Sequence, residues 1–136
     1  MKISRSLEAK KLRELAKDVL RFLGNKGAAL DVNFVDAKIM KSLNWKFRGK
    51  KFSTNVLAFE TPKDFPRLPG SKFPRHLGEI YLDLAYIKRH HESKEYMLIH
   101  GVLHLMGFDH KKKGDRMRME KLEKKILEWQ KTKFWV

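Results

Sequence analysis

The sequence predicts an α+β (α/β) fold in which helices pack on a small mixed sheet. Apolar residues recur at helical spacing in long segments, and short runs between them have the alternation or the β-branched and aromatic content of strands. The chain length is the third observation. With 136 residues, the chain can build one hydrophobic core but not two, so we expect a single domain over residues 1–136 with one functional site.

The N-terminal part of the chain is expected to form a helix, a strand and a second, short helix. Residues 7–23 carry apolar side chains at helical spacing, and Gly24 suits the left-handed residue that ends a helix. Residues 30–35 alternate apolar and polar side chains, which is the periodicity of a strand. Asp36 can then cap a helix that runs through Leu43.

The other strands of the sheet are expected on either side of a proline-rich segment. Residues 54–59 and 79–84 have strand character, and Met1–Ser4 would add an edge strand, which gives a sheet of about four strands. All four prolines lie between residues 62 and 74, so this segment should be an extended loop.

Two further helices are expected to complete the domain. Ser93 can cap a helix over residues 94–106, and Gly107 can end it in the left-handed conformation. A last helix over residues 115–131 carries one apolar stripe, which is typical of a helix packed on a core. The residues of this stripe are Met119, Leu122, Ile126 and Trp129.

The composition excludes several classes of protein. The chain contains no cysteine, so disulfides, thiolate metal sites and a cysteine nucleophile are excluded, and any transition metal must be held by His, Asp or Glu. The longest uncharged runs are too short to span a bilayer, and the N-terminal residues lack the pattern of a signal peptide. We therefore expect a cytoplasmic protein with no membrane partner. The net charge of +15 favours polyanions and makes nucleic acid the first partner to consider, ahead of an anionic membrane surface.

The most specific pattern in the chain is a group of three histidines with the spacing HxxxHxxGxxH. His100 and His104 are one helical turn apart, so both imidazoles can reach one ion from the same face of a helix. Gly107 allows the chain to turn, and His110 can then return as a third ligand. Three protein ligands leave an open coordination position, as in catalytic zinc sites, whereas structural sites are usually closed by a fourth ligand.

The same spacing occurs in the metzincin pattern HExxHxxGxxH, which makes the expected metal-binding helix zincin-like. In that pattern the residue after the first histidine is the glutamate that acts as general base in peptide hydrolysis, and here it is Gly101. The loss of this carboxylate argues against a conventional metalloprotease. A phosphodiester suits the site better, because a metal can polarise a phosphoryl oxygen while cationic side chains stabilise the added negative charge.

Three blocks of the sequence resemble those of the YbeY-type bacterial endoribonucleases of ribosomal RNA maturation. The blocks are Leu43-Asn44 through Arg48-Gly49-Lys50 into residues 53–59, then residues 77–80, then the histidine block. The resemblance covers most of the chain and implies a single domain with helices on a four-stranded mixed sheet. It also implies that His100, His104 and His110 bind one metal ion, usually taken as zinc, with another divalent metal as the alternative.

The resemblance further implies an activity and its partners. It points to a single-strand-specific, metal-dependent endoribonuclease that acts in ribosomal RNA processing, including maturation of the 16S rRNA 3′ end, and in ribosome quality control. The implied partners are single-stranded RNA, the small ribosomal subunit and ribosome-assembly proteins. Arg48 matches an arginine regarded as important for activity, so we expect it to clamp a phosphate or stabilise the transition state. An ordinary salt bridge or a solvated turn beside Gly49 is the alternative role.

The chain departs from the family pattern near the expected site. Tyr96 stands where a further histidine is common, and Glu79 stands where aspartate is more frequent. Phe47 and Phe108 replace tyrosines, and no residue is assigned as the general base. Asp109 is a candidate partner for a ligand imidazole and Glu79 a candidate to face the site, with a turn or surface role as the alternative for both.

Other basic, aromatic and histidine side chains have two interpretations. An aromatic set interleaved with basic residues could stack bases beside phosphate contacts, or could pack the core while its lysines face water. The set comprises Trp45, Phe47 and Phe52 with Lys46, Arg48, Lys50 and Lys51. The other histidines, His76, His90 and His91, are expected on a solvated or phosphate-contacting surface rather than at a second metal.

Two other functions stay open at this point. One is a noncatalytic ribosome-assembly or RNA-binding factor whose metal is structural. RNA binding that survives metal removal, with no cleavage before it, would identify this function. The other is a metalloprotease-like or other hydrolase of small substrates, which Gly101 makes less attractive and which cleavage of peptides rather than RNA would identify.

Overall fold

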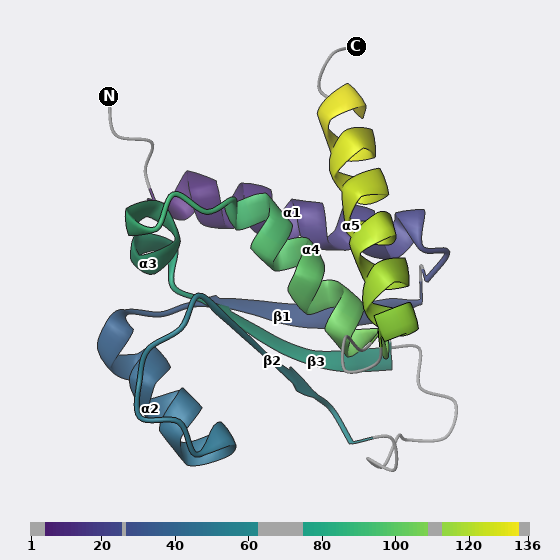
Figure 1. Cartoon of the computed structure of the whole chain (residues 1–136). Coiled ribbons are helices and arrows are strands. Elements are labelled where there is room, and N and C mark those ends of the chain that lie inside the picture. Colours follow the sequence, from purple (N-terminus) through teal and green to yellow (C-terminus); the bar gives the residue numbers. More distant parts are fainter. Residues whose placement is uncertain (1–4, 26, 63–74, 109–112, 134–136) are drawn as a thin grey trace.

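The computed structural model describes residues 5–25, 27–62, 75–108 and 113–133 of the chain. Within these ranges, five helices and a three-stranded mixed sheet form an α+β fold (Figure 1), which confirms the predicted class. The predicted edge strand over Met1–Ser4 and most of the predicted proline-rich loop lie outside the described residues. None of the helices in the described ranges is long and apolar enough to cross a membrane.

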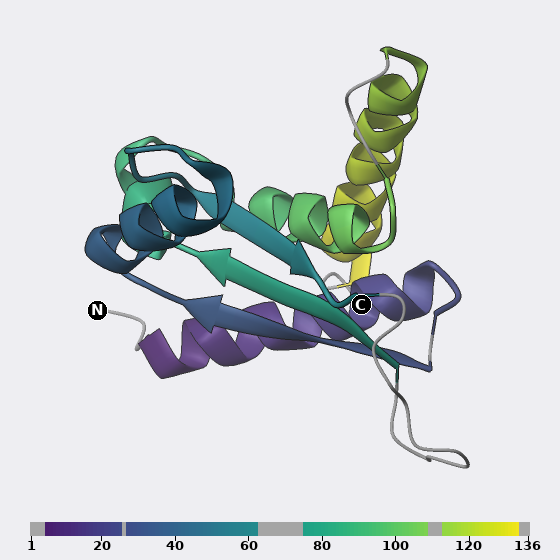
Figure 2. The same cartoon turned by 90° about the horizontal axis from the view of Figure 1, so that it is seen from below.

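The elements alternate along the chain, with the sheet built from three separate segments. Their order is α1 (Arg5–Phe22), β1 (Ala28–Phe34), α2 (Ala37–Arg48), β2 (Val56–Glu60), β3 (Arg75–Leu82), α3 (Leu84–Arg89), α4 (Lys94–Leu105) and α5 (Lys113–Lys133). In the sheet the order is β1-β3-β2, with β1 parallel and β2 antiparallel to β3. Among the described strands β2 is therefore an edge, as Figure 2 shows from below.

One hydrophobic core joins the sheet to the helices on one of its faces. The helices α1 and α4 lie on this face, while α2 lies on the other side at one end of the sheet (Figure 1). Ile80 and Leu82 of β3 are fully buried in the core, and α4 adds Val102 to it. Leu12 and Val19 confirm the predicted apolar stripe of α1. The predicted stripe of α5 is buried at Met119 and Ile126, and Leu122 packs partly buried against the core.

The helix after Asp36 is longer than predicted. The Asp36 side chain accepts a hydrogen bond from the backbone N–H of Ile39 at 2.9 Å, so the predicted cap is confirmed. The predicted end at Leu43 is wrong, because no helix breaker occurs before Gly49, which has a φ of 67° and ends α2 in the left-handed conformation. This extension places Arg48 on the last turn of a helix rather than in a loop.

The end of the third strand was also predicted incorrectly. Residues 79–84 were expected to be extended, but β3 ends at Leu82, and Asp83 accepts a hydrogen bond from the backbone N–H of Tyr86 at 3.0 Å. Asp83 therefore caps the short helix α3, which the prediction lacked. At its other end β3 begins at Arg75, because it continues to pair with β1 there.

Two glycines allow α4 to approach the sheet closely. A Cβ atom at Gly101 would lie 3.2 Å from both Cδ1 and Cγ2 of Ile80. Gly78 has a φ of 151°, and a Cβ there would collide with the carbonyl oxygen of Phe59 and lie 2.8 Å from Cδ2 of Leu105. Since ordinary carbon contacts are about 3.5–4.0 Å, Gly78 lacks room for a side chain, and a Cβ at Gly101 would require Ile80 to shift by a few tenths of an ångström. The distance between α4 and β3 thus depends on two residues without a Cβ.

Candidate active site

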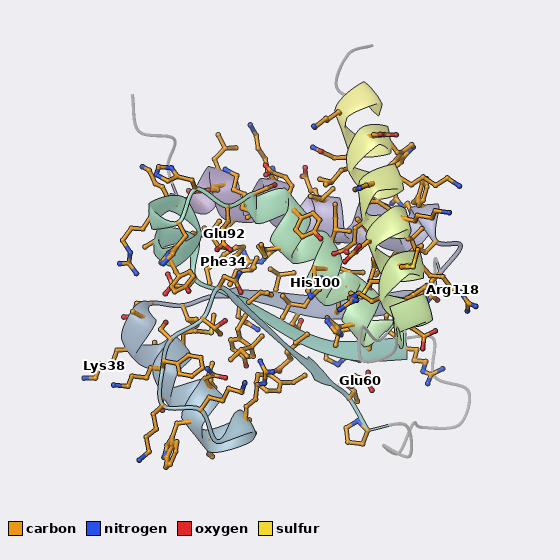
Figure 3. The ribbon with its side chains drawn as sticks, in the orientation of Figure 1. Phe34, Lys38, Glu60, Glu92, His100 and Arg118 are labelled. Atoms are coloured by element: carbon orange, nitrogen blue, oxygen red, sulfur yellow. The ribbon has the colours of Figure 1, made fainter. Side chains whose placement is uncertain are left out.

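A cavity of about 520 Å³ lies beside the edge strand β2, between α4 and the end of α2. Figure 3 shows parts of two of its walls, with His100 on α4 and Glu60 at the end of β2. The helix α2 contributes Arg48 to the lining, and β2 contributes residues 56–58. Three segments distant in sequence therefore meet at this cavity, as is usual for a ligand site.

The structure brings His100 and His104 together at this cavity. Their Nε2 atoms are 3.0 Å apart, and the two rings meet edge to face with their centroids separated by 4.6 Å. The helical spacing that predicted a shared face accounts for this proximity. The third predicted ligand, His110, and the neighbouring Asp109 lie outside the described residues.

A buried carboxylate from another helix holds the first histidine. Glu123 of α5 is 1% exposed, and its Oε2 atom accepts a hydrogen bond from Nδ1 of His100 at 2.8 Å. Because a carboxylate only accepts, Nδ1 carries the hydrogen, and Nε2 of His100 is the atom turned toward His104. Histidines that bind metals are commonly oriented by a carboxylate in this way.

The second oxygen of Glu123 is held by Tyr96, one turn before His100. The Tyr96 hydroxyl donates to Oε1 of Glu123 at 3.1 Å. Burial, followed by the charge of Glu123, raises the pKa of Tyr96 to about 12, so the hydroxyl keeps its proton at neutral pH. The tyrosine that replaces a common histidine of the family thus supports the His100 partner. Both oxygens of the buried carboxylate are satisfied.

Sequence reasoning missed Glu123, although the sequence contains an indication of it. Glu123 lies four residues after Met119 and three before Ile126, so it belongs to the stripe that α5 buries. A carboxylate on an apolar stripe needs a buried partner. That partner is supplied by α4, which periodicity within α5 alone does not reveal.

Arg48 reaches the cavity from its other side. Its exposed side chain lies on the last turn of α2, and the residue lines the same cavity as His100 and His104. The Arg48 side chain makes no hydrogen bond or ion pair with any of the described residues. Within the described ranges the salt-bridge alternative is therefore not observed, and the position of the residue would let its guanidinium meet an anion in the cavity.

Glu79 does not face the histidines. Ile80 points toward Gly101 of α4, so its neighbours in β3 project from the opposite face of the sheet. On that face Glu79 accepts a hydrogen bond from the Tyr81 hydroxyl at 2.7 Å. The hypothesis that Glu79 faces the site is thus wrong.

His76 and His90 have partners elsewhere in the fold. His76 makes hydrogen bonds at 2.9 Å with both Asp31 and Thr61. His90 donates from Nδ1 to the carbonyl of Tyr86 at 2.9 Å and stacks on its ring. Neither residue is among those that line the cavity of His100 and His104.

Comparison with known proteins identifies the family. The sequence profile of Endoribonuclease YbeY matches residues 2–131. The chain belongs to the YbeY family. A relative from Chelativorans sp. (strain BNC1) is 40% identical over 111 residues, which cover 74% of this chain and 65% of the relative. One from Stenotrophomonas maltophilia (strain K279a) is 38% identical over 110 residues, which cover 74% of this chain and 66% of the relative. Both carry the name Endoribonuclease YbeY.

The chain spans slightly less than two thirds of the length of these YbeY relatives, at 65% and 66%. The fold is also similar to a protein solved in solution, TM1509 from Thermotoga maritima. The two have a TM-score of 0.51 and 24% sequence identity, and the match covers 96% of this chain and 89% of the other. At this identity the similarity concerns the fold alone.

The side chains at the cavity fit two positions of a metal site. Two imidazole nitrogens bound to one tetrahedral zinc at about 2.0–2.1 Å would be about 3.3 Å apart. The Nε2 atoms of His100 and His104 are 3.0 Å apart, and Glu123 orients one of them. Within the described ranges, no group of three His, Cys, Asp or Glu side chains forms a complete ligand set.

The residue directly after the first histidine has a steric reason to be glycine. Gly101 is buried where α4 contacts β3, and any Cβ there would press on Ile80. A glutamate at this position would add a carboxylate to an apolar contact that is tight even for a methyl group. The protease-type general base is thus excluded by the packing of α4 on the sheet.

Proposed function

We propose that this chain is a metal-dependent endoribonuclease that hydrolyses single-stranded RNA. The observation that carries the proposal is the pair of Nε2 atoms of His100 and His104, 3.0 Å apart at the wall of a cavity that Arg48 also lines. The name shared by the curated relatives, Endoribonuclease YbeY, supports the same activity. The net charge of +15 supports a polyanionic substrate.

His100, His104 and His110 would hold one divalent ion, with zinc as the proposed metal. Such an ion supplies Lewis acidity toward a phosphoryl oxygen and lowers the pKa of a water bound to it. The chain's own side chains have separate roles. Glu123 fixes the ring orientation and the tautomer of His100 through the hydrogen bond of 2.8 Å.

Arg48 would bind the scissile phosphate from the opposite wall of the cavity. Its planar guanidinium can donate two parallel hydrogen bonds to phosphate oxygens and stabilise the charge that develops on them. Arg48 and the two histidines line the same cavity, so a phosphate bound there could contact both. Positioning and electrostatic stabilisation are the contributions we assign to the protein.

The cellular role proposed for this activity is ribosomal RNA processing in the cytoplasm. It includes maturation of the 16S rRNA 3′ end and ribosome quality control, with the small ribosomal subunit and ribosome-assembly proteins as partners. Family membership and the basic surface support this role. A noncatalytic assembly factor and a peptide hydrolase are the competing functions, and Gly101 disfavours the second.

The test uses the purified chain with a defined single-stranded RNA, its duplex form and a panel of peptides. We expect zinc-dependent cleavage of the single strand, and loss of both bound zinc and cleavage in His104→Ala and His110→Ala. The variant His90→Ala, prepared identically, is the matched control because His90 contacts Tyr86 outside the cavity. Unchanged zinc content and cleavage in His104→Ala would refute the proposal. Undiminished RNA binding without zinc, with no cleavage before its removal, would identify an assembly factor.

A further inference from the structure

Three large aromatic side chains at and after the end of α2 are exposed. Trp45 is 52%, Phe47 58% and Phe52 59% exposed, so the hypothesis that these rings pack the core is wrong. Each ring has a lysine ammonium near its face: Lys51 lies 5.1 Å from Trp45, Lys46 5.4 Å from Phe47 and Lys50 5.9 Å from Phe52. These distances are those of cation–π contacts.

Basic and aromatic residues also follow one face of α2 toward the cavity. Lys38, Lys41, Trp45 and Arg48 are spaced at i, i+3, i+7 and i+10, so they lie on the same side of the helix. We call these residues, together with Lys51, the α2 face. Four residues of the α2 face line a surface hollow of about 370 Å³, namely Lys38, Lys41, Trp45 and Lys51. The fifth, Arg48, lines the cavity of His100 and His104. Figure 3 shows Lys38 pointing outward from α2.

The length of the α2 face suits a short stretch of nucleic acid. From Lys38 to Arg48 the helix rises about 15 Å at 1.5 Å per residue. About four nucleotides stacked at 3.4 Å cover the same distance. The face can therefore contact several nucleotides of a strand whose next phosphate enters the cavity.

The loop after α2 is held against the helix before any ligand binds. The buried side chain of Asn44 donates to the carbonyl of Phe52 at 2.8 Å, and the backbone N–H of Lys50 donates to the carbonyl of Asn44 at 3.3 Å. Gly49 supplies the left-handed turn between them. These contacts hold the backbone on both sides of Lys51, whose ammonium lies over Trp45, so less backbone entropy is lost when the loop binds a ligand.

The charge of this segment points to a polyanion. Residues 37–59 contain six basic residues and no aspartate or glutamate. Exposed aromatic rings beside lysines match single-stranded nucleic acid, whose unpaired bases stack on the rings while the lysines contact phosphates. In a duplex the bases are already stacked on one another, so the rings would gain much less.

We propose that the α2 face binds the bases and phosphates of single-stranded RNA and leads the strand into the cavity of His100 and His104. Trp45 is the stacking residue, Lys38, Lys41 and Lys51 contact phosphates, and Arg48 joins the face to the cavity. The assignment of RNA rests on the proposed function. The binding surface itself is testable without cleavage.

The experiment measures equilibrium binding of the full chain to a fluorescent oligoadenylate, to the same strand in a duplex, and to polyglutamate. Trp45→Ala is expected to weaken binding to the single strand about 5-fold or more, with little change for the duplex. Trp45→Phe retains a ring and should keep most of the affinity. Met117→Ala is the matched control, because Met117 is 55% exposed on α5, far from this face in the sequence.

The lysine contribution is measured by a second pair of variants. Lys51→Ala removes a charge beside Trp45, whereas Lys124→Ala removes one from the exposed surface of α5. Only the first is expected to reduce the dependence of single-strand binding on salt concentration. Equal effects of the two variants would show that the overall charge, rather than the α2 face, binds the strand, and would overturn the inference.

Failure of this inference and failure of the proposed function have different outcomes. Wild-type affinity of Trp45→Ala for the single strand would overturn the α2 face while leaving cleavage by the histidine site intact. Cleavage by His104→Ala would instead overturn the proposed function, and the loss of affinity in Trp45→Ala would still support the face. If Trp45→Ala lost affinity for polyglutamate and kept it for RNA, the partner would be an acidic protein and the inference would be wrong.

Discussion

The helices α2 and α4 are both 12 residues long and border the same cavity, yet they are packed in opposite ways. Helix α4 buries six of its residues, while α2 buries only Met40 and Asn44. Two histidines that converge to 3.0 Å need a helix fixed on the sheet from behind. A surface that receives a flexible strand needs exposed rings and cations, and only local contacts to hold them. The comparison indicates that α4 fixes the geometry of the two histidines, whereas α2 provides affinity for the strand.

The largest difference between the two sides should come from alanine at two glycines. In Gly78→Ala the new Cβ would collide with the Phe59 carbonyl and press on Leu105, at a φ of 151°. Gly49→Ala, at the end of α2, has a φ of 67° and nothing within 4 Å. We expect a loss of about 3 kcal/mol or more for the first and about 1–2 kcal/mol for the second, measured by urea denaturation. Equal losses would show that β2 and α4 do not approach Gly78 as closely as described.

The next effect concerns the buried partner of His100. Glu123→Ala removes the carboxylate that orients His100 and should weaken zinc binding by about 10–100-fold, measured by competition with a chelating dye. Glu123→Gln keeps an acceptor and should lose less. Glu120→Ala, which removes an exposed carboxylate from the same helix, is the control. Equal zinc affinity in the two alanine variants would show that Glu123 does not support metal binding by His100.

A third and smaller effect tests the contact of Gly101 with Ile80. Gly101→Ala gains about 1 kcal/mol of helix propensity and loses about 1–3 kcal/mol by overpacking, so a net loss of up to about 2 kcal/mol is expected. In the background of Ile80→Ala, which removes all three close atoms, the same change should become stabilising. Unfolding of the four proteins of this cycle in urea measures the coupling. Additive free energies would contradict the close contact.

The smallest effect is a pH dependence on the side of the sheet that faces α2. The hydrogen bond to Glu79, followed by burial, raises the pKa of Tyr81 above its ordinary value near 10. The stability contributed by the folded tyrosine is therefore complete below pH 10 and is lost as pH rises through the folded pKa, because the unfolded state releases its proton first. Tyr81→Phe should show a shallower loss of stability in alkaline thermal denaturation. An equally steep loss of stability with pH in the wild type and in Tyr81→Phe would show that Tyr81 does not cause it.

Local chemistry allowed much of the fold to be predicted. The apolar stripe of α1, the cap at Asp36 and the cap at Ser93 act within one or two turns, so the sequence contains the information that fixes them. Helix α3 was missed because Asp83 follows a strand directly and was assigned to it. The residues before Asp83 have strand character, and the prediction extended the strand through Asp83 instead of starting a helix there.

The site was less predictable than the elements that carry it. The spacing of His100 and His104 gave their common face, but their link to Glu123 depends on how α5 packs against α4. Arg48 was singled out by resemblance to the family, since nothing in the spacing of α2 relates it to a histidine in α4. Contacts between elements distant in sequence arise from packing of the whole core, which local patterns do not encode.

The close contact between Gly101 and Ile80 also limits how such a site can change during evolution. A chain of this kind that acquired a glutamate at position 101 would first lose stability, because Ile80 occupies the space that the new side chain needs. If Ile80 were shortened first, the intermediate would contain a cavity in its core, which is also costly. Exchange between a glycine-containing and a glutamate-containing histidine motif therefore requires two dependent substitutions, and the intermediate with one substitution would be less stable than the chains before and after it.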